Sequence, residues 1–156
     1  MNFSNKTAII TGGANGIGLC ITEEFRKLGA KVGVIDINSK GCDCDLFHCG
    51  DIADERTLVA FVDKVAATFG KVDYLINNAC ISRKGILSGC GYDDFLYVQK
   101  VGVVAPYMLT KLLLPHFNEG AAVVNVCFGR QYVFFKARAL FFHVNNSFKF
   151  NVRGHV

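Results

Sequence analysis

A glycine-rich segment near the amino terminus constrains the fold of this chain more than any other feature. Residues 11–18 read TGGANGIG, and they lie between an apolar run that ends at Ile10 and a stretch with helical periodicity. When a strand turns directly into a helix, the free N–H groups at the start of the helix face an anion, and glycines let that anion approach the backbone. The order of strand, turn and helix therefore predicts a nucleotide-phosphate turn rather than a plain glycine turn.

An acidic residue follows at the distance that a dinucleotide site requires. Residues 31–36 read as a second strand that ends in Asp36, 18 positions beyond Gly18. A carboxylate there bonds both ribose hydroxyls of an adenosine, whereas the 2′-phosphate of NADP would meet its negative charge. Neither the glycine turn nor Ile37, which follows the aspartate, supplies an Arg or Lys to neutralise that phosphate. The sequence therefore favours NAD as the cofactor over NADP.

Apolar patterns with strand and helix spacing alternate along most of the chain. Strands are expected at residues 6–11, 31–36, 46–49, 72–76 and 121–126, and helices at 17–28, 54–69, 92–98 and 103–117. Such alternation is typical of a parallel sheet with helices on both faces. The expected fold class is α/β, with a doubly wound, Rossmann-like sheet.

Composition bounds the class of protein. The chain has 156 residues, enough for one domain, and 51% of them are hydrophobic. No apolar stretch reaches the roughly 18 residues of a membrane span, and the first residues lack the apolar core of a signal peptide. The seven cysteines are an odd number spread over expected helices, strands and loops, which favours reduced thiols over a disulfide framework. We therefore expect a cytoplasmic protein with no membrane partner.

The composition shifts near residue 127. No Asp or Glu follows Glu119, whereas five Arg or Lys residues do, and six phenylalanines lie between residues 134 and 150. We expect an NAD-binding domain over residues 1–127 and a divergent, basic, Phe-rich segment over 128–156, with a helix at 131–144. Five bases make too thin a patch for nucleic acid, so we expect no such partner. A change of reading frame relative to the ancestral sequence, for example by a frameshift or a mis-spliced exon, would also explain this composition.

Three motifs together resemble the classical short-chain dehydrogenase/reductase family. They are TGGANGIG at residues 11–18, GDI at 50–52 after the third expected strand, and NNAC at 77–80, where the family has NNAG. The resemblance extends over residues 6–126. It implies a fold in which these three segments surround a nicotinamide cofactor.

The resemblance also assigns roles within the cofactor site. It implies that Asp51 binds the adenine amino group, that Ile52 packs against the adenine ring, and that Asn78 and Ala79 line the adenosine ribose. A helix N-cap is the alternative for Asp51, and a turn is the alternative for the asparagines. The expected cofactor-binding residues are Gly12, Asn15, Gly16, Ile17, Gly18, Asp36, Ile37, Asp51, Ile52, Asn78 and Ala79.

The resemblance implies hydride transfer between the nicotinamide and a small-molecule alcohol or carbonyl. In the family a tyrosine exchanges the proton, a lysine lowers the pKa of that tyrosine, a serine bonds the substrate oxygen and an asparagine completes a proton relay. This chain departs from the pattern at each position. Gly102 stands where the asparagine is expected, Cys127 and Phe128 where the serine is expected, and Phe141 and Asn145 where the tyrosine and lysine are expected.

A Tyr-x-x-x-Lys pattern occurs earlier, at Tyr132 and Lys136. On a helix, side chains four residues apart are neighbours, so these two are the candidate catalytic pair. A chance pairing in a segment rich in Phe, Lys and Tyr is the alternative. We therefore predict an NAD-dependent oxidoreductase with impaired catalysis or, alternatively, a non-catalytic NAD-binding module.

The family continues through further strands and helices beyond the point where this sequence stops. We therefore expect the sheet to lack the last strands of the family, with an unpaired edge on the fifth strand. The apolar helix at 103–117 would also be uncovered. In the family this helix is a dimer surface, so we expect a homo-oligomer that forms through it.

Four soft or borderline metal ligands lie close together in the sequence. Cys42, Cys44, His48 and Cys49 fall within eight residues, and zinc prefers such ligands. Their spacing matches neither a finger nor a ribbon, so we expect no metal there.

Overall fold

The computed structural model describes residues 2–38, 40–81, 89–131, 134–143 and 151–153. Within them, one sheet has the strand order β3-β2-β1-β4-β5-β6-β7. The strands are β1 (Thr7–Thr11), β2 (Lys31–Asp36), β3 (Leu46–Cys49), β4 (Val72–Asn77), β5 (Phe117–Gln131), β6 (Phe134–His143) and β7 (Asn151–Arg153). The helices are α1 (Gly16–Lys27), α2 (Glu55–Phe69), α3 (Tyr92–Gln99), the π-helical η1 (Lys100–Val104), α4 (Ala105–Leu113) and the 3-10 turn η2 (Leu114–His116).

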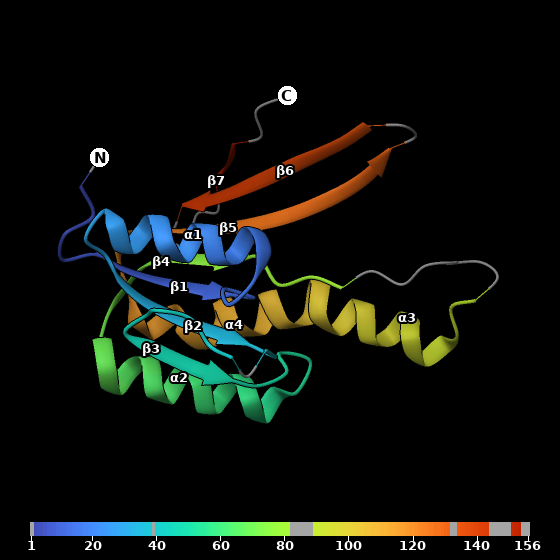
Figure 1. Cartoon of the computed structure of the whole chain (residues 1–156), viewed down its shortest axis with the longest axis horizontal. Coiled ribbons are helices and arrows are strands. Elements are labelled where there is room, and N and C mark those ends of the chain that lie inside the picture. Colours follow the sequence, from blue (N-terminus) through green and yellow to red (C-terminus); the bar gives the residue numbers. More distant parts are fainter. Residues whose placement is uncertain (1, 39, 82–88, 132–133, 144–150, 154–156) are drawn as a thin grey trace.

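The first five strands are parallel, which confirms the predicted doubly wound α/β fold. β1 lies between β2 and β4, while β3 flanks β2 and β5 flanks β4. Figure 1 shows α1 on one face of this sheet and α2 and α4 on the other. The chain adds β2 and β3 on one side of β1 and then adds β4 and β5 on the other side, so the order of the strands reverses between β1 and β4. In open α/β sheets, ligands bind at such a switch point, beyond the carboxyl ends of the strands.

Side chains of β1 point alternately into two hydrophobic cores, one on each face of the sheet. Ala8 and Ile10 belong to the core against which Ile21 and Phe25 of α1 pack. Ile9 belongs to the core that includes the inner faces of α2 and α4. All of β1 is buried, because a parallel strand with helices on both sides has no solvated face. The two cores fix the carboxyl ends of β1, β2 and β4 relative to one another.

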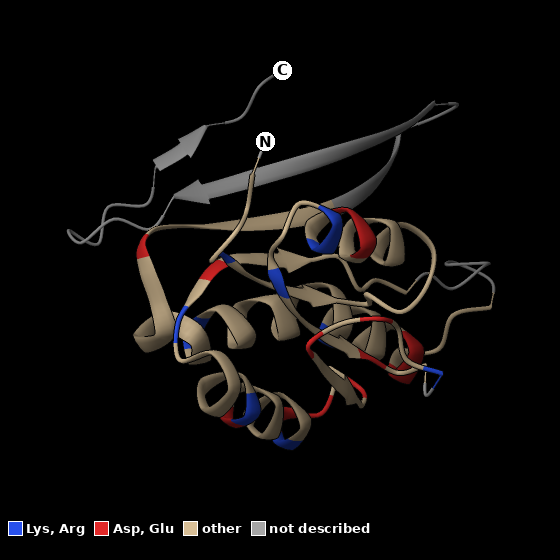
Figure 2. Ribbon diagram, turned by 60° about the vertical axis from the view of Figure 1, so that its left-hand side comes forward, with Lys and Arg blue, Asp and Glu red and all other residues tan. Residues whose placement is uncertain are grey.

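Charged residues lie on the outward side of the helices. α1 carries Glu23 and Glu24 beside Arg26 and Lys27, and Figure 2 shows acidic and basic segments interspersed along the ribbon. Lys27 pairs with Glu24 at 3.6 Å, and Arg26 reaches Asp45, before β3, at 2.9 Å. The second pair joins α1 to the loop that leads into β3.

Residues 134–143 form a strand, so the helix predicted over residues 131–144 is wrong. β6 pairs with β5 in antiparallel register, from Gln131↔Phe134 to Ala122↔His143. The apolar residues of this segment fall at nearly every position, and such a pattern does not separate a helix from a strand. Its phenylalanines suit a strand, because aromatic side chains pack well on a pleated surface.

The edge of β5 is paired, although the sequence predicted it to be unpaired. β6 runs along this edge, and β7 pairs with β6 in turn. β5 is accordingly longer than the predicted strand at 121–126. Figure 1 shows β5 and β6 extending together beyond the parallel strands.

The helical region after residue 91 contains a π-helical turn. α3, η1 and α4 follow one another without a break, with Gly102 inside η1. The helices predicted at 92–98 and 103–117 are confirmed in position, but the second ends in the 3-10 turn that contains Pro115. Proline ends a helix because it lacks an N–H and its ring clashes with the preceding turn. In the described part of the chain, every helix is too short or too polar to cross a bilayer.

Candidate functional site

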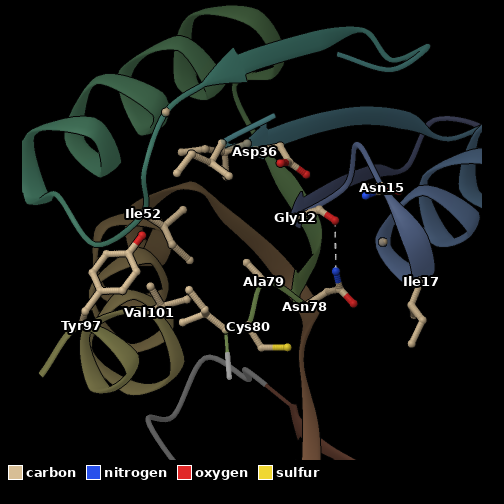
Figure 3. A pocket seen from close by; sticks show the side chains of 15 residues that line it. Gly12, Asn15, Ile17, Asp36, Ile52, Asn78, Ala79, Cys80, Tyr97 and Val101 are labelled. Carbon is tan, nitrogen blue, oxygen red and sulfur yellow. Dashed lines mark hydrogen bonds between the residues drawn. The ribbon is translucent and has the colours of Figure 1, made fainter. Parts of the chain in front are cut away.

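A cavity of about 380 Å³ opens at the carboxyl ends of β1, β2 and β4. Figure 3 shows the glycine turn on one side of this cavity and Tyr97 and Ile52 on the other. The cavity is lined by most of the residues predicted to bind a cofactor, namely Gly12, Asn15, Ile17, Gly18, Asp36, Ile37, Ile52, Asn78 and Ala79. Gly16 and Asp51 are next to lining residues but do not line the cavity themselves. The structure thus brings together residues from four separate segments of the sequence.

The glycine turn keeps the backbone close to the start of α1. Gly12 has a φ of +66°, in the left-handed region that favours glycine. A Cβ atom at Gly18 would collide with the carbonyl oxygen of Gly12. Asn15 caps α1 by accepting the N–H of Gly16 at 2.8 Å, and the first turn of the helix carries no acidic residue. The positive end of the helix dipole is therefore available to an anion.

Thr11 and Asn78 fasten the glycine turn to the end of β4. The Thr11 hydroxyl oxygen accepts the backbone N–H groups of Asn78 and Ala79, both at 3.0 Å. The Asn78 side-chain amide donates to the carbonyl oxygens of Thr11 and Gly12, both at 3.1 Å. Because these bonds are buried or partly buried, they hold two walls of the cavity at a fixed separation.

The carboxylate of Asp36 is held by the backbone on both sides. One oxygen accepts the N–H of Ala14 in the glycine turn at 2.8 Å, and the other accepts the N–H of Asn38 at 2.8 Å. The residue is only 8% exposed, yet it lines the cavity. A carboxylate has about four lone-pair sites, so two remain for hydroxyl groups of a ligand.

Asp51 and Ile52 lie in the turn that follows β3. One oxygen of Asp51 accepts the N–H of Ala53 at 2.9 Å, and the other accepts the Tyr97 hydroxyl at 2.9 Å. The N-cap of α2 is Asp54, so Asp51 does not take the capping role that was the alternative for it. Ile52 is buried in the core and also faces the cavity.

The two asparagines of the NNAC segment have different environments. Asn77 is the last residue of β4, and its amide nitrogen donates to the side-chain oxygen of Asn125 on β5 at 2.9 Å. Its own side-chain oxygen is buried without a hydrogen-bond partner in the described part of the chain. Asn77 therefore ties β4 to β5, whereas Asn78 lies beyond the strand and faces the glycine turn.

Tyr97 and Val101 line the cavity but were missed by the sequence analysis. They come from α3 and η1, outside every motif. Because they are four residues apart, helical spacing places both on one face. That four-residue spacing was the signal in the sequence that could have identified them.

The thiols between β2 and β3 are partly buried. Burial raises the pKa of the Cys42 thiol and raises that of Cys44 to about 12. Burial also lowers the pKa of His48, with a smaller contribution from the charge of Lys64. Among the described residues, His, Cys, Asp and Glu form no group of three or more that could hold a metal ion.

The sequence model of the short chain dehydrogenase family matches residues 6–133. This chain belongs to that family. It is 40% identical over 118 residues to momilactone A synthase of Oryza sativa subsp. japonica, which corresponds to 68% of this chain and 43% of that protein. The chain spans about half the length of the curated relatives it matches, with 43%, 55% and 49% of three of them covered.

Two solved structures show the same fold with a nicotinamide cofactor. A 3-ketoacyl-(acyl-carrier-protein) reductase from Brucella melitensis, complexed with NADH, is 32% identical with a TM-score of 0.67, covering 74% of this chain and 51% of that one. A short chain dehydrogenase from Burkholderia cenocepacia J2315, in complex with NADP, is 30% identical with a TM-score of 0.71, covering 80% and 56%. Similar dehydrogenases therefore bind either cofactor.

The structure places only some of the positions that carry catalysis in short-chain dehydrogenases. Gly102 lies in η1, where an added Cβ atom would meet no atom of another part of the chain within 4 Å, and Cys127 and Phe128 lie in β5. Lys136 lies in β6, opposite Gly129, so the helical spacing that was expected to bring it beside Tyr132 does not apply. Tyr132 is outside the described residues, and its catalytic role stays a prediction.

Proposed function

We propose that this chain binds NAD and belongs to an oxidoreductase that transfers hydride between the nicotinamide and an alcohol or carbonyl of a small molecule. One observation carries the proposal: a single cavity at the switch point of the sheet is lined by the glycine turn, Asp36, Ile52 and Asn78. A dinucleotide needs these features together, because its pyrophosphate requires a helix N-terminus and its ribose requires a hydrogen-bond acceptor.

Charge at the ribose end supports NAD rather than NADP. The Asp36 carboxylate is fixed by two backbone N–H groups at 2.8 Å and lines the cavity. Among the described residues that line this cavity, none is Arg or Lys. A 2′-phosphate would therefore meet a negative charge without a compensating cation.

Titration of the chain with NAD and NADP by calorimetry tests this proposal. Asp36→Asn removes the charge but keeps an acceptor for the N–H of Ala14, so we expect the preference for NAD to fall about 10- to 100-fold. Asp63→Asn, at an exposed position of α2, serves as the matched control and should leave the preference unchanged. Tighter binding of NADP than NAD by the unaltered chain would overturn the cofactor assignment.

Impaired catalysis is part of the same proposal. Gly102 cannot relay a proton and Phe128 cannot bond a carbonyl oxygen, so turnover would depend on the candidate pair Tyr132 and Lys136. A screen of secondary alcohols, with reduced nicotinamide as the readout, should give slow turnover that Tyr132→Phe abolishes without weakening NAD binding. NAD binding with no turnover on any alcohol would support the alternative, a non-catalytic NAD-binding module.

Exposed apolar side chains support assembly through the region of residues 103–117. Val103, Val104 and Tyr107 are 59%, 48% and 64% exposed, next to exposed residues of α3. We propose that a second copy packs on this surface, as the resemblance to the family implies. Val103→Asp should shift the chain toward monomer in sedimentation experiments, whereas Val59→Asp, at an exposed apolar position of α2, should not.

The proposal also covers the division of the chain and its location in the cell. We propose that residues 1–127 form the NAD-binding domain and that residues 128–156 form a divergent segment. The boundary between them falls inside β5. We also propose a cytoplasmic location, since the odd number of cysteines favours a reducing compartment. Fractionation of cells that express a tagged chain tests the location.

A further inference from the structure

The hydroxyl of Tyr97 donates a hydrogen bond to the carboxylate of Asp51 at 2.9 Å. This bond joins α3 to the turn that follows β3. The Tyr97 ring packs against the core that includes Ile52 and Val101, and all three side chains line the same end of the cavity (Figure 3). An aromatic ring and two aliphatic side chains thus form an apolar wall beside a fixed carboxylate.

The Asp51 carboxylate is oriented before any ligand arrives. Its other oxygen accepts the N–H of Ala53 at 2.9 Å, so both oxygens are held, one by the backbone and one by Tyr97. Each oxygen keeps a lone pair, because a carboxylate has about four acceptor sites. A group that is fixed in its bound geometry avoids the entropic cost of ordering when the ligand binds.

We propose that Tyr97 is a positioning residue that makes the cavity selective for an amino-bearing purine, acting through Asp51. This inference rests on the proposed dinucleotide function. A carboxylate accepts a hydrogen bond from the amino group of adenine, whereas the carbonyl oxygen of hypoxanthine at the same ring position offers a second acceptor and is disfavoured. Without the Tyr97 hydroxyl, the carboxylate is free to turn toward water, and this discrimination weakens.

A pair of dinucleotides that differ at one ring position provides the test. NAD carries the amino group, and nicotinamide hypoxanthine dinucleotide carries an oxygen in its place. Calorimetric titration of both gives a preference ratio for the whole chain and for Tyr97→Phe, which keeps the ring. We expect Tyr97→Phe to lower the ratio about 3- to 10-fold, mainly through weaker NAD binding.

Two further variants separate positioning from a general loss of structure. Tyr92→Phe removes a hydroxyl from the same helix at a residue that is 77% exposed, and it should leave the ratio unchanged. Asp51→Ala removes the acceptor, and adding Tyr97→Phe to it should change the ratio no further if Tyr97 acts through Asp51. A structural defect would instead weaken the binding of both dinucleotides equally.

The outcomes distinguish this inference from the function on which it rests. A wild-type preference for NAD that falls in Tyr97→Phe but not in Tyr92→Phe supports the role of Tyr97. NAD binding with no preference, or with a preference that survives Tyr97→Phe, overturns the inference and leaves the dinucleotide function standing. Failure of the wild-type chain to bind either dinucleotide overturns both.

Discussion

The carboxylate of Asp73 accepts the backbone N–H of Thr7 at 2.9 Å, which joins the amino end of β4 to the amino end of β1. Its other oxygen accepts hydrogen bonds from Lys6 Nζ and from the side-chain amide of Asn118, both at 3.0 Å. One acid that is only 5% exposed therefore connects β1, β4 and β5 at the end of the sheet opposite the cavity.

We expect Asp73→Asn to lower the free energy of unfolding near neutral pH by about 1 to 3 kcal/mol, because it removes a buried charge-assisted network. Burial raises the pKa of Asp73, but the N–H of Thr7, Lys6 and Asn118 together hold it below its usual range. A carboxyl with a depressed folded pKa stabilises the protein above its unfolded pKa, about 3.9, and this stability is lost as pH falls through the folded pKa.

Urea unfolding of the wild-type chain and Asp73→Asn, from about pH 7 down to pH 3, checks this expectation. The difference between the two proteins should shrink below about pH 4. A difference that stays constant over the whole range would mean that the charge of Asp73 contributes nothing to stability.

We expect Thr11→Val to destabilise the chain by about 1 to 3 kcal/mol and to weaken NAD binding. Valine has nearly the shape of threonine, but it leaves the N–H groups of Asn78 and Ala79 without their acceptor. Thermal unfolding and calorimetry measure the two effects. Thr68→Val, at an exposed position of α2, is the control and should change neither.

Gly18→Ala and Gly102→Ala should have opposite effects. A Cβ atom at Gly18 collides with the carbonyl oxygen of Gly12, so the alanine must open the glycine turn and abolish NAD binding. A Cβ atom at Gly102 would enter open space, and replacing a helical glycine by alanine stabilises by about 0.5 to 1 kcal/mol. Melting temperatures and NAD titration of both variants test the pair; equal behaviour would contradict the packing described for the turn.

Cysteine reactivity should follow the surroundings of each thiol. Burial raises the pKa of Cys44 to about 12, whereas Cys20 and Cys49 are exposed. Since the thiolate is the nucleophile, brief treatment with iodoacetamide at about pH 8 should alkylate Cys20 and Cys49 before Cys44. Peptide mass spectrometry reports the order, and early labelling of Cys44 in the folded chain would contradict its partly buried environment.

The sequence was most informative where local pattern and fold require the same residue. The glycine turn and Asp36 were predicted because a strand, a turn and a helix leave few choices for the residues between them. The five parallel strands followed from runs of apolar residues with helical segments between them. Asn78 was found through a motif, although its bonds to Thr11 and Gly12 could not be anticipated from spacing alone.

The errors have physical causes as well. Residues 134–143 carry apolar side chains at nearly every position, so periodicity gave no basis for choosing the strand that pairing with β5 produces. Tyr97 was missed because its role depends on a contact between α3 and the turn after β3, which are 46 residues apart in sequence. Long-range contacts of this kind override local preference and leave no trace in local spacing.

The hydrogen bond from Ala14 to Asp36 gives position 36 a structural role in addition to its proposed role in cofactor binding. Any residue that replaces the aspartate, whichever nucleotide it is chosen to suit, must also satisfy a buried amide of the neighbouring turn. Redesign of cofactor preference at this position therefore carries a stability penalty unless the new side chain, as in Asp36→Asn, or a second substitution supplies an acceptor for this amide. An adaptive path toward NADP through a residue that offers no acceptor would therefore need a compensating change in the turn.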